Sequence, residues 1–298
     1  MPKVKVSVLR LSLWFRQVFK KSLNLSLLKR VAEIIYDWRF VLAKLTKMPL
    51  IGKTIHFLMF KPDNLIYLPK DSVIQKSNRV ITINKVVSEL EEVVLPSEVL
   101  NHFIEKANHH WIMNFCICRV SNKCENYPSD LGCLFLGEAV LNINPRLGRL
   151  VTKEEALAHV HRCREAGLVH LVGRLKLDAI ALGIGPDHKL LTICNCCECC
   201  CLTHLLPHFS LQIQKHVTRM PGVKLTVTDQ CIGCGKCLTS CFVNAIQLIN
   251  KQAVISDFCR GCGRCVDTCP KKAIFLTIND YRFVEKSIER ISKSVDVV

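Results

Sequence analysis

Residues 231–241 read CIGCGKCLTSC, and residues 259–269 repeat the pattern as CRGCGRCVDTC, 28 positions further along the chain. The similarity extends beyond the cysteines, because Ala245-Ile246 follows the first copy at the same offset as Ala273-Ile274 follows the second. A duplicated segment of this length indicates one small module built from two equivalent halves. The spacing in both halves is Cys-x2-Cys-x2-Cys-x3-Cys.

This spacing suits an iron–sulfur cube. Three cysteines separated by two residues allow one tight loop to direct three thiolates at a single cubane. The glycines permit left-handed turns and leave backbone N–H groups free to donate to cluster sulfides. Zinc is the alternative metal, but zinc sites favour paired Cys-x2-Cys units over runs of four cysteines. The pattern therefore favours iron–sulfur clusters.

Residues 224–278 resemble a bacterial ferredoxin domain with two [4Fe–4S] clusters. In that family the fourth cysteine of each run binds the cluster of the other run. The resemblance implies one cluster held by Cys231, Cys234, Cys237 and Cys269, and a second held by Cys259, Cys262, Cys265 and Cys241. It also implies a ferredoxin-like fold of two β-hairpin and helix repeats that transfers single electrons. Phe242 departs from the family, which has a proline at this position, so we expect altered local packing around an intact ligand set.

Ten further cysteines form two groups in the middle of the chain. The first group is Cys116, Cys118, Cys124 and Cys133, and the second is Cys194, Cys196, Cys197, Cys199, Cys200 and Cys201. Four thiolates complete one cubane, so ten thiols suffice for two more clusters, or for one cluster with reactive or spare thiols. In an extended segment neighbouring side chains face opposite ways, so Cys194 and Cys196 could serve one side and Cys197 and Cys199 another. We predict at least one additional metal centre here, and a structural role for the isolated Cys163.

The order of these segments carries a second resemblance. A Cys-x-Cys-Arg segment at 116–119, a Cys-Asn-Cys-Cys-x-Cys-Cys-Cys segment at 194–201 and a terminal dicluster module resemble a family of uncharacterised iron–sulfur proteins of anaerobic bacteria and archaea. The resemblance covers residues 100–278 and implies iron–sulfur binding in a redox context, without an assigned reaction. The chain has no Walker loop, dinucleotide fingerprint or serine nucleophile elbow, so we expect neither a nucleotide nor a flavin.

Positive charge is concentrated at the beginning of the chain. The 298 residues carry a net charge of 41 − 25 = +16, and residues 1–60 contribute +10 of it, from twelve Lys and Arg against two acids. Apolar residues recur there at steps of three and four, which predicts basic amphipathic helices. Such helices could attach the protein to an anionic membrane surface or to a larger complex, or could simply pack on the core. No nucleic-acid reading motif accompanies the charge, so we do not expect a nucleic-acid partner.

These observations predict an α+β protein in four parts. The parts are a basic helical region (1–60), a mixed α/β cysteine-rich domain (61–223), the ferredoxin module (224–278) and a C-terminal helix or tail (279–298). Within the second part we expect a helix after Ser97, a helix with a capping box from Thr152 to Glu155, a strand at 168–172 and a β-rich run at 80–83. No signal peptide or membrane span is visible, and abundant cysteine favours a reducing compartment, so we expect a cytoplasmic protein, with a peripheral position on the inner membrane face as the alternative.

Two hypotheses for the function follow from this organisation. The first is an electron-transfer protein that relays electrons between a protein donor and a protein acceptor. The second is an oxidoreductase whose catalytic metal centre lies in the Cys116–Cys133 and Cys194–Cys201 region and receives electrons from the ferredoxin module.

Overall fold

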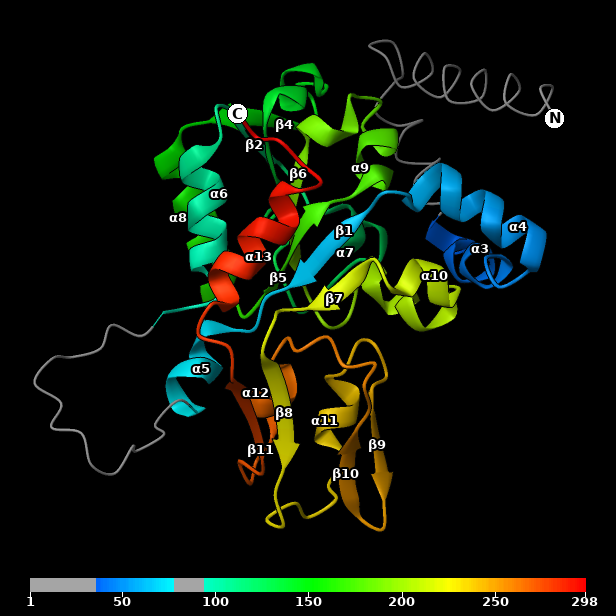
Figure 1. Cartoon of the computed structure of the whole chain (residues 1–298), viewed down its shortest axis with the longest axis vertical. Coiled ribbons are helices and arrows are strands. Elements are labelled where there is room, and N and C mark those ends of the chain that lie inside the picture. The colour runs from blue at the N-terminus through cyan, green and yellow to red at the C-terminus, as the bar shows by residue number, and fades with distance from the viewer. Residues whose placement is uncertain (1–35, 78–93) are drawn as a thin grey trace, which may run out of the picture.

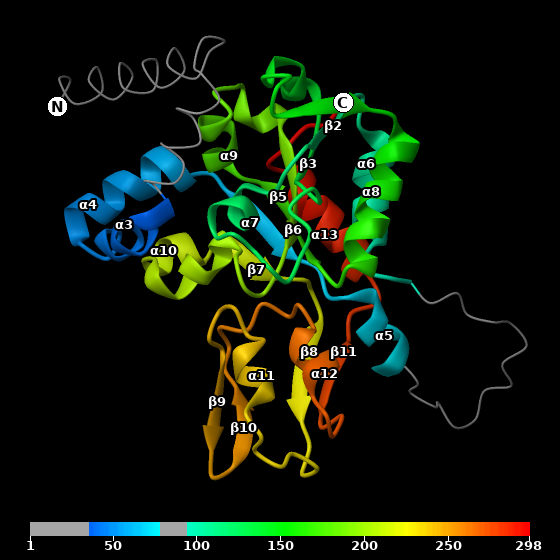
Figure 2. The ribbon, with the colours of Figure 1, turned by 180° about the vertical axis from the view of Figure 1, so that it is seen from behind.

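The computed structural model describes residues 36–77 and 94–298. Its helices and strands are mixed along the chain, which confirms the α+β class. A domain built on one large sheet forms most of the molecule, and the ferredoxin module lies at one end of it, beyond β7, in both views of the ribbon (Figures 1 and 2).

The large sheet has seven strands in the order β4-β2-β3-β6-β5-β1-β7. Neighbouring strands are antiparallel, except for the parallel pair β1 and β7. The expected strand at 168–172 is confirmed as β5. The bounds are β1 Asn64–Tyr67, β2 His110–Met113, β3 Leu134–Leu136, β4 Gly148–Val151, β5 Val169–Arg174, β6 Leu191–Cys196 and β7 Val217–Arg219. The central strand is β6. It ends at Cys196, so it carries the second cysteine group to the end of the sheet that faces the module.

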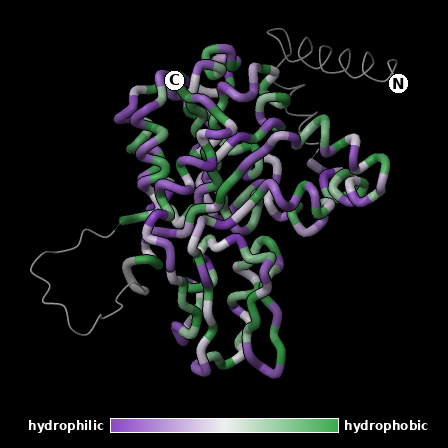
Figure 3. The backbone as a smooth tube through the Cα atoms, viewed as in Figure 1, coloured by the Kyte–Doolittle hydropathy of each residue, from purple (hydrophilic) through white to green (hydrophobic). Residues whose placement is uncertain are grey.

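One face of the sheet is covered by α6 (Glu98–Lys106), α8 (Lys153–Glu165) and α13 (Phe283–Ser292). Along these helices apolar and polar residues alternate (Figure 3), and the apolar side chains pack with those of the strands in one core. Ile291, Val295 and Val297 are buried in that core. The chain therefore returns from the ferredoxin module to complete the sheet domain.

The expected helix starts are present, with one difference. In α8 the Thr152 hydroxyl accepts from the Glu155 backbone N–H at 3.2 Å, and the Glu155 carboxylate accepts from the Thr152 N–H at 2.9 Å, which confirms the capping box. Ser97 is at the N-cap of α6, but its side chain makes no capping bond. Its backbone N–H donates instead to the Asp71 carboxylate at 3.1 Å, so a neighbouring segment fixes this position.

The other face of the sheet is covered by short elements. Trp111, Phe135 and Leu190 form the core there with Ala179 of α9. The short elements are α7 (Ile117–Ser121), α9 (Lys176–Ala181) and α10 (Leu211–Gln214), with 3-10 helices η2 (Glu138–Asn142), η3 (Asp187–Lys189) and η4 (Leu202–His208). The remaining short helix, α5 (Asp71–Ser77), packs instead in the core formed with α6, α8 and α13.

The part of the basic region that the structure describes is helical, as expected. It consists of α3 (Arg39–Leu45), α4 (Pro49–Ile55) and the π-helix η1 (His56–Phe60). Residues 1–35 and the predicted β-rich run at 80–83 lie outside the described residues. Within 36–77 and 94–298, no helix combines the length and apolar character that crossing a bilayer requires.

The ferredoxin module pairs its strands in two ribbons. β9 (Ile246–Ile249) and β10 (Gln252–Ile255) form a hairpin, while β8 (Val223–Val227) pairs antiparallel with β11 (Ile274–Ile278), joining the two ends of the module. Each half has one short helix, α11 (Lys236–Thr239) or α12 (Arg264–Thr268). Gly235 and Gly263 precede these helices in left-handed conformations, with φ of +75° and +83°, as expected for the tight cysteine loops.

Candidate metal centres

The first cavity of the ferredoxin module is lined by Cys231, Cys234, Cys237 and Cys269 and has a volume of about 340 Å³. These four thiols are the set that the ferredoxin resemblance implies for one cluster. The backbone N–H of Ala253 donates to the Cys231 sulfur at 3.4 Å, and that of Ala273 donates to Cys269 at 3.2 Å. The cavity thus combines four thiols with amide donors from the backbone.

The second cavity is lined by Cys241, Cys259, Cys262 and Cys265, with a volume of about 330 Å³. Cys241 belongs to the first half of the repeat and the other three to the second, so this set too is assembled across the two halves. The Ala245 N–H donates to Cys241 at 3.3 Å, which repeats the relation of Ala273 to Cys269. Burial raises the pKa of Cys262 to about 11. A bound cation is therefore needed to hold this thiol as a thiolate near neutral pH.

Two arginines make the second cavity suitable for an anionic group. Arg260 and Arg264 line it, and both are almost fully buried. Within the described part of the chain, the Nε of each is buried and has no hydrogen-bond partner. Buried donors of this kind are costly unless an acceptor is present. A cluster held by four thiolates carries net negative charge and would supply one.

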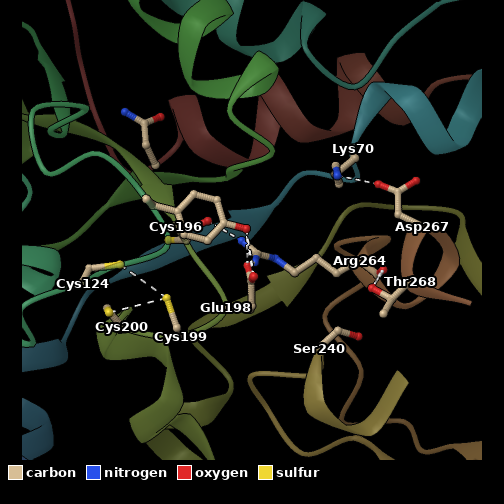
Figure 4. A network of polar contacts seen from close by, with 12 residues as sticks. Lys70, Cys124, Cys196, Glu198, Cys199, Cys200, Ser240, Arg264, Asp267 and Thr268 are labelled. Atoms are coloured by element: carbon tan, nitrogen blue, oxygen red, sulfur yellow. Dashed lines mark hydrogen bonds and ion pairs between the residues drawn. The ribbon is translucent and has the colours of Figure 1, made fainter. Parts of the chain in front are cut away.

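The ten middle-domain cysteines, which the sequence leaves as two groups, are divided differently by the fold. Cys124, Cys197, Cys199 and Cys200 form one compact set, whose sulfur atoms all lie within 4.8 Å of one another. Cys199 is 3.6 Å from Cys124 and 3.5 Å from Cys200 (Figure 4). We call these residues the compact set.

A second set is a chain of sulfur contacts. Cys116 contacts Cys118, Cys118 contacts Cys201, and Cys201 contacts Cys196. Three of these four side chains are at most 9% exposed, and the Tyr67 hydroxyl lies 3.6 Å from the Cys196 sulfur. We call Cys116, Cys118, Cys196 and Cys201 the buried set.

The remaining cysteines lie outside both sets. Cys133 and Cys194 contact each other, with 3.8 Å between their sulfurs. Cys163 is fully buried on α8, and burial raises its pKa to about 12, as suits the structural thiol that the sequence predicts. Along 194–201 we expected side chains to alternate between two sides. Cys197 and Cys199 do lie together and apart from Cys196, but Cys194 contacts Cys133 instead of joining Cys196.

Two aromatic rings connect the second cavity to the buried set. Phe242 follows Cys241 directly, is 2% exposed, and packs against Tyr67 in a tilted arrangement with 4.9 Å between ring centroids. Tyr67 in turn contacts Cys196. The phenylalanine at 242, where the ferredoxin family has proline, thus packs between the module and the sheet domain. The sequence pointed to this contact only through the unusual residue at 242, and nothing in it pointed to Tyr67.

Polar contacts join the same two domains (Figure 4). Arg264 pairs with the Glu198 carboxylate and donates to the Cys196 carbonyl. The Tyr127 hydroxyl also donates to Glu198, at 2.8 Å. Lys70 pairs with Asp267 at 2.5 Å. The cysteine segment 194–201 is therefore fastened to the loop that lines the second cavity.

Comparison with known proteins supports the identification of the module. Residues 226–276 match the family described as the 4Fe-4S dicluster domain. No curated protein and no solved structure matches the chain. The chain therefore contains a ferredoxin-type dicluster domain and binds iron–sulfur clusters. The wider resemblance over residues 100–278 stays a prediction.

Proposed function

We propose that this protein relays single electrons between a protein donor and a protein acceptor through two [4Fe–4S] clusters. One cluster is held by Cys231, Cys234, Cys237 and Cys269, and the other by Cys259, Cys262, Cys265 and Cys241. The observation that carries the proposal is the pair of cavities, each lined by three thiols from one half of the repeat and one from the other.

The chain's own residues prepare both cavities for this chemistry. When bound, each cluster supplies a one-electron redox centre whose potential depends on hydrogen bonds and burial. Backbone N–H groups donate to Cys231, Cys241, Cys259 and Cys269, which stabilises negative charge on these sulfurs. Ile246, Ile274 and Ala253 pack around the buried Cys237 and Cys265 and exclude water from the space between the cavities.

The two cavities differ in what surrounds them. The first contains the exposed Cys234 and the Ile232 side chain, which is 58% exposed, so an external partner can approach it. The second is covered by the sheet domain through Phe242 and Arg264. We therefore place the docking site of the external partner at the first cavity, and the exchange of electrons with the middle domain at the second.

The middle domain extends the relay in this proposal. We place an additional cluster at the buried set, Cys116, Cys118, Cys196 and Cys201, with Cys133 and Cys194 beside it. Its support is the burial of the set, a spread of its four sulfurs wider than that of Cys124, Cys197, Cys199 and Cys200, and the Tyr67–Phe242 connection to the second cavity. In this arrangement an electron passes from the module to the middle domain without leaving the protein.

The alternative function is a redox enzyme whose catalytic centre lies in the middle domain. One observation favours it, because Cys199 is exposed and a small molecule could reach its surroundings. A substrate-dependent change in the EPR signal of a middle-domain centre would favour the enzyme. A spectrum that no small molecule alters would favour the relay.

We further propose that residues 1–60 dock on an anionic membrane surface or a larger complex, with the protein otherwise cytoplasmic. In the described part, Trp38, Leu50 and Phe57 are 60%, 83% and 61% exposed beside Arg39 and Lys53. Apolar side chains flanked by basic ones suit the interface of an anionic bilayer. Flotation with anionic liposomes tests this, and equal flotation after deletion of 1–60 would contradict it.

The assignment of each fourth ligand to the other half of the repeat can be tested by replacing cysteines and counting the clusters that remain. A variant with Cys231, Cys234 and Cys237 replaced by serine should lose one cluster, measured anaerobically as about four irons and four sulfides. In that background Cys241→Ser should remove a second cluster, whereas the matched change Cys269→Ser should remove none. The opposite result would show that each half binds its cluster with its own four thiols. Wild-type protein that contains no iron would overturn the proposal as a whole.

A further inference from the structure

The compact set differs from the other cysteine sets in the spacing of its sulfurs. All four sulfurs lie within 4.8 Å of one another, and two of the separations are 3.5 Å and 3.6 Å. A tetrahedral ion with metal–sulfur bonds of about 2.3 Å places its ligand sulfurs roughly 3.8 Å apart. The compact set therefore has the dimensions of a site for one ion.

A cubane requires a wider arrangement. It has one iron at each of four separated corners, and each iron takes its own thiolate, so the four sulfurs stand farther apart than around one ion. Over the described ranges 36–77 and 94–298, no other group of three or more potential ligands has all of its ligand atoms within 4.8 Å of one another. The ferredoxin thiols and the buried set are thus spread more widely in the same structure. The difference lies in the fold, because all of these residues are cysteines.

Two features beside the compact set would offset the negative charge of a bound tetrathiolate site. The Arg119 guanidinium is fully buried beside Cys197 and donates to the Asn195 carbonyl at 2.9 Å. The backbone N–H groups of Asn126 and Tyr127 donate to the Cys124 sulfur. Four thiolates around a divalent ion carry two net negative charges, and a buried guanidinium with amide donors offsets part of that charge.

We propose that Cys124, Cys197, Cys199 and Cys200 bind a single tetrahedral metal ion, with zinc as the expected occupant. A closed shell of four cysteines without an open position is typical of structural zinc sites. The ion would join the segment after α7 to the segment after β6, although Cys124 and Cys199 are 75 residues apart. It would thereby fix Glu198, which lies between two of the ligands and pairs with Arg264 of the ferredoxin module.

The experiment measures metals and sulfide in the full chain, purified anaerobically. The test variant is Cys197→Ser/Cys199→Ser. The matched control is Cys163→Ala, because Cys163 packs in the same apolar cluster as Cys197 and Cys200 but lies outside the compact set. We expect the test variant to lose one zinc per chain with iron and sulfide unchanged, and the control to lose nothing. Loss of one iron without sulfide would also support a single-ion site, occupied by iron.

Two outcomes would overturn the proposal. Loss of iron together with sulfide would identify a cluster, and an unchanged metal content would identify reduced thiols. If the test variant does not fold, X-ray absorption at the zinc edge of the wild-type protein decides instead. One shell of sulfur at about 2.3 Å with no metal neighbour is expected, and a metal–metal shell would contradict it. Because the irons of the ferredoxin module are counted in the same samples, failure of this proposal is distinct from failure of the relay.

Discussion

Replacing Arg264 by methionine should weaken the attachment of the ferredoxin module to the sheet domain. The Arg264 side chain is 5% exposed and its partner Glu198 is 32% exposed. Removing one partner of a fully buried ion pair costs about 3–5 kcal/mol. Glu198 is partly solvated and still accepts the hydrogen bond from the Tyr127 hydroxyl. We therefore expect a loss at or below the lower end of that range, about 2–3 kcal/mol in the free energy of unfolding. The lost bond to the Cys196 carbonyl acts in the same direction.

The assay is urea unfolding under anaerobic conditions, followed by far-UV circular dichroism and by the visible absorbance of the clusters. The matched control is Lys70→Met, because the pair of Lys70 and Asp267 bridges the same two domains but is 20% and 25% exposed. This control should cost about 0–1 kcal/mol. Adding Glu198→Gln to Arg264→Met should recover about 1 kcal/mol, since the unpaired carboxylate is then gone. Equal losses for Arg264→Met and Lys70→Met would refute the reasoning.

Three further predictions concern other contacts. Phe242→Ala should reduce the free energy of unfolding by about 3–4 kcal/mol, because the ring is buried against Tyr67. Stopped-flow spectroscopy should also show slower reduction of the middle domain through the module. An unchanged rate would exclude the aromatic connection. Burial raises the pKa of Asp63 to about 8. Between the unfolded and the folded pKa the folded protein therefore binds one more proton than the unfolded chain, and the free energy of unfolding should fall by up to about 1.4 kcal/mol per pH unit between about pH 5 and 7. Asp63→Asn should flatten that slope, and a slope that persists would contradict the assignment. Gly263→Ala should lower cluster occupancy, because φ is +83° and the added Cβ would lie 2.8 Å from the Val73 Cγ2; unaltered iron content and melting temperature would show that the loop adapts.

The ferredoxin module shows how much of a site a sequence can contain. Three of the four thiols in each cavity come from one loop of seven residues, and the glycines that allow the loop to turn are part of the same motif. Local geometry therefore brings three thiols of each set together, whereas the fourth thiol was assigned from the ferredoxin resemblance and comes from the other half of the repeat. The capping box of α8 and the start of α6 after Ser97 are equally local, and both were predicted correctly.

The middle domain shows the opposite case. The cysteines of 194–201 are adjacent in sequence, but the direction of each side chain depends on where β6 ends and on which segment lies across from it. Cys199 meets Cys124, whereas Cys196 meets Cys201 and Tyr67. These partners come from distant parts of the chain, and the sequence contains no spacing rule for pairs that only the folded sheet brings together.

The amino-acid sequence by itself determined the dicluster module, its tight loops and the three thiols that each loop brings together, because those residues are a few positions apart. Only the tertiary structure decided how ten other thiols divide between a compact and a buried set, why Phe242 stands where a proline is usual, and that the C-terminal helix returns to the sheet domain. The physical reason is that long-range packing, unlike a turn, is set by the whole arrangement of strands and helices.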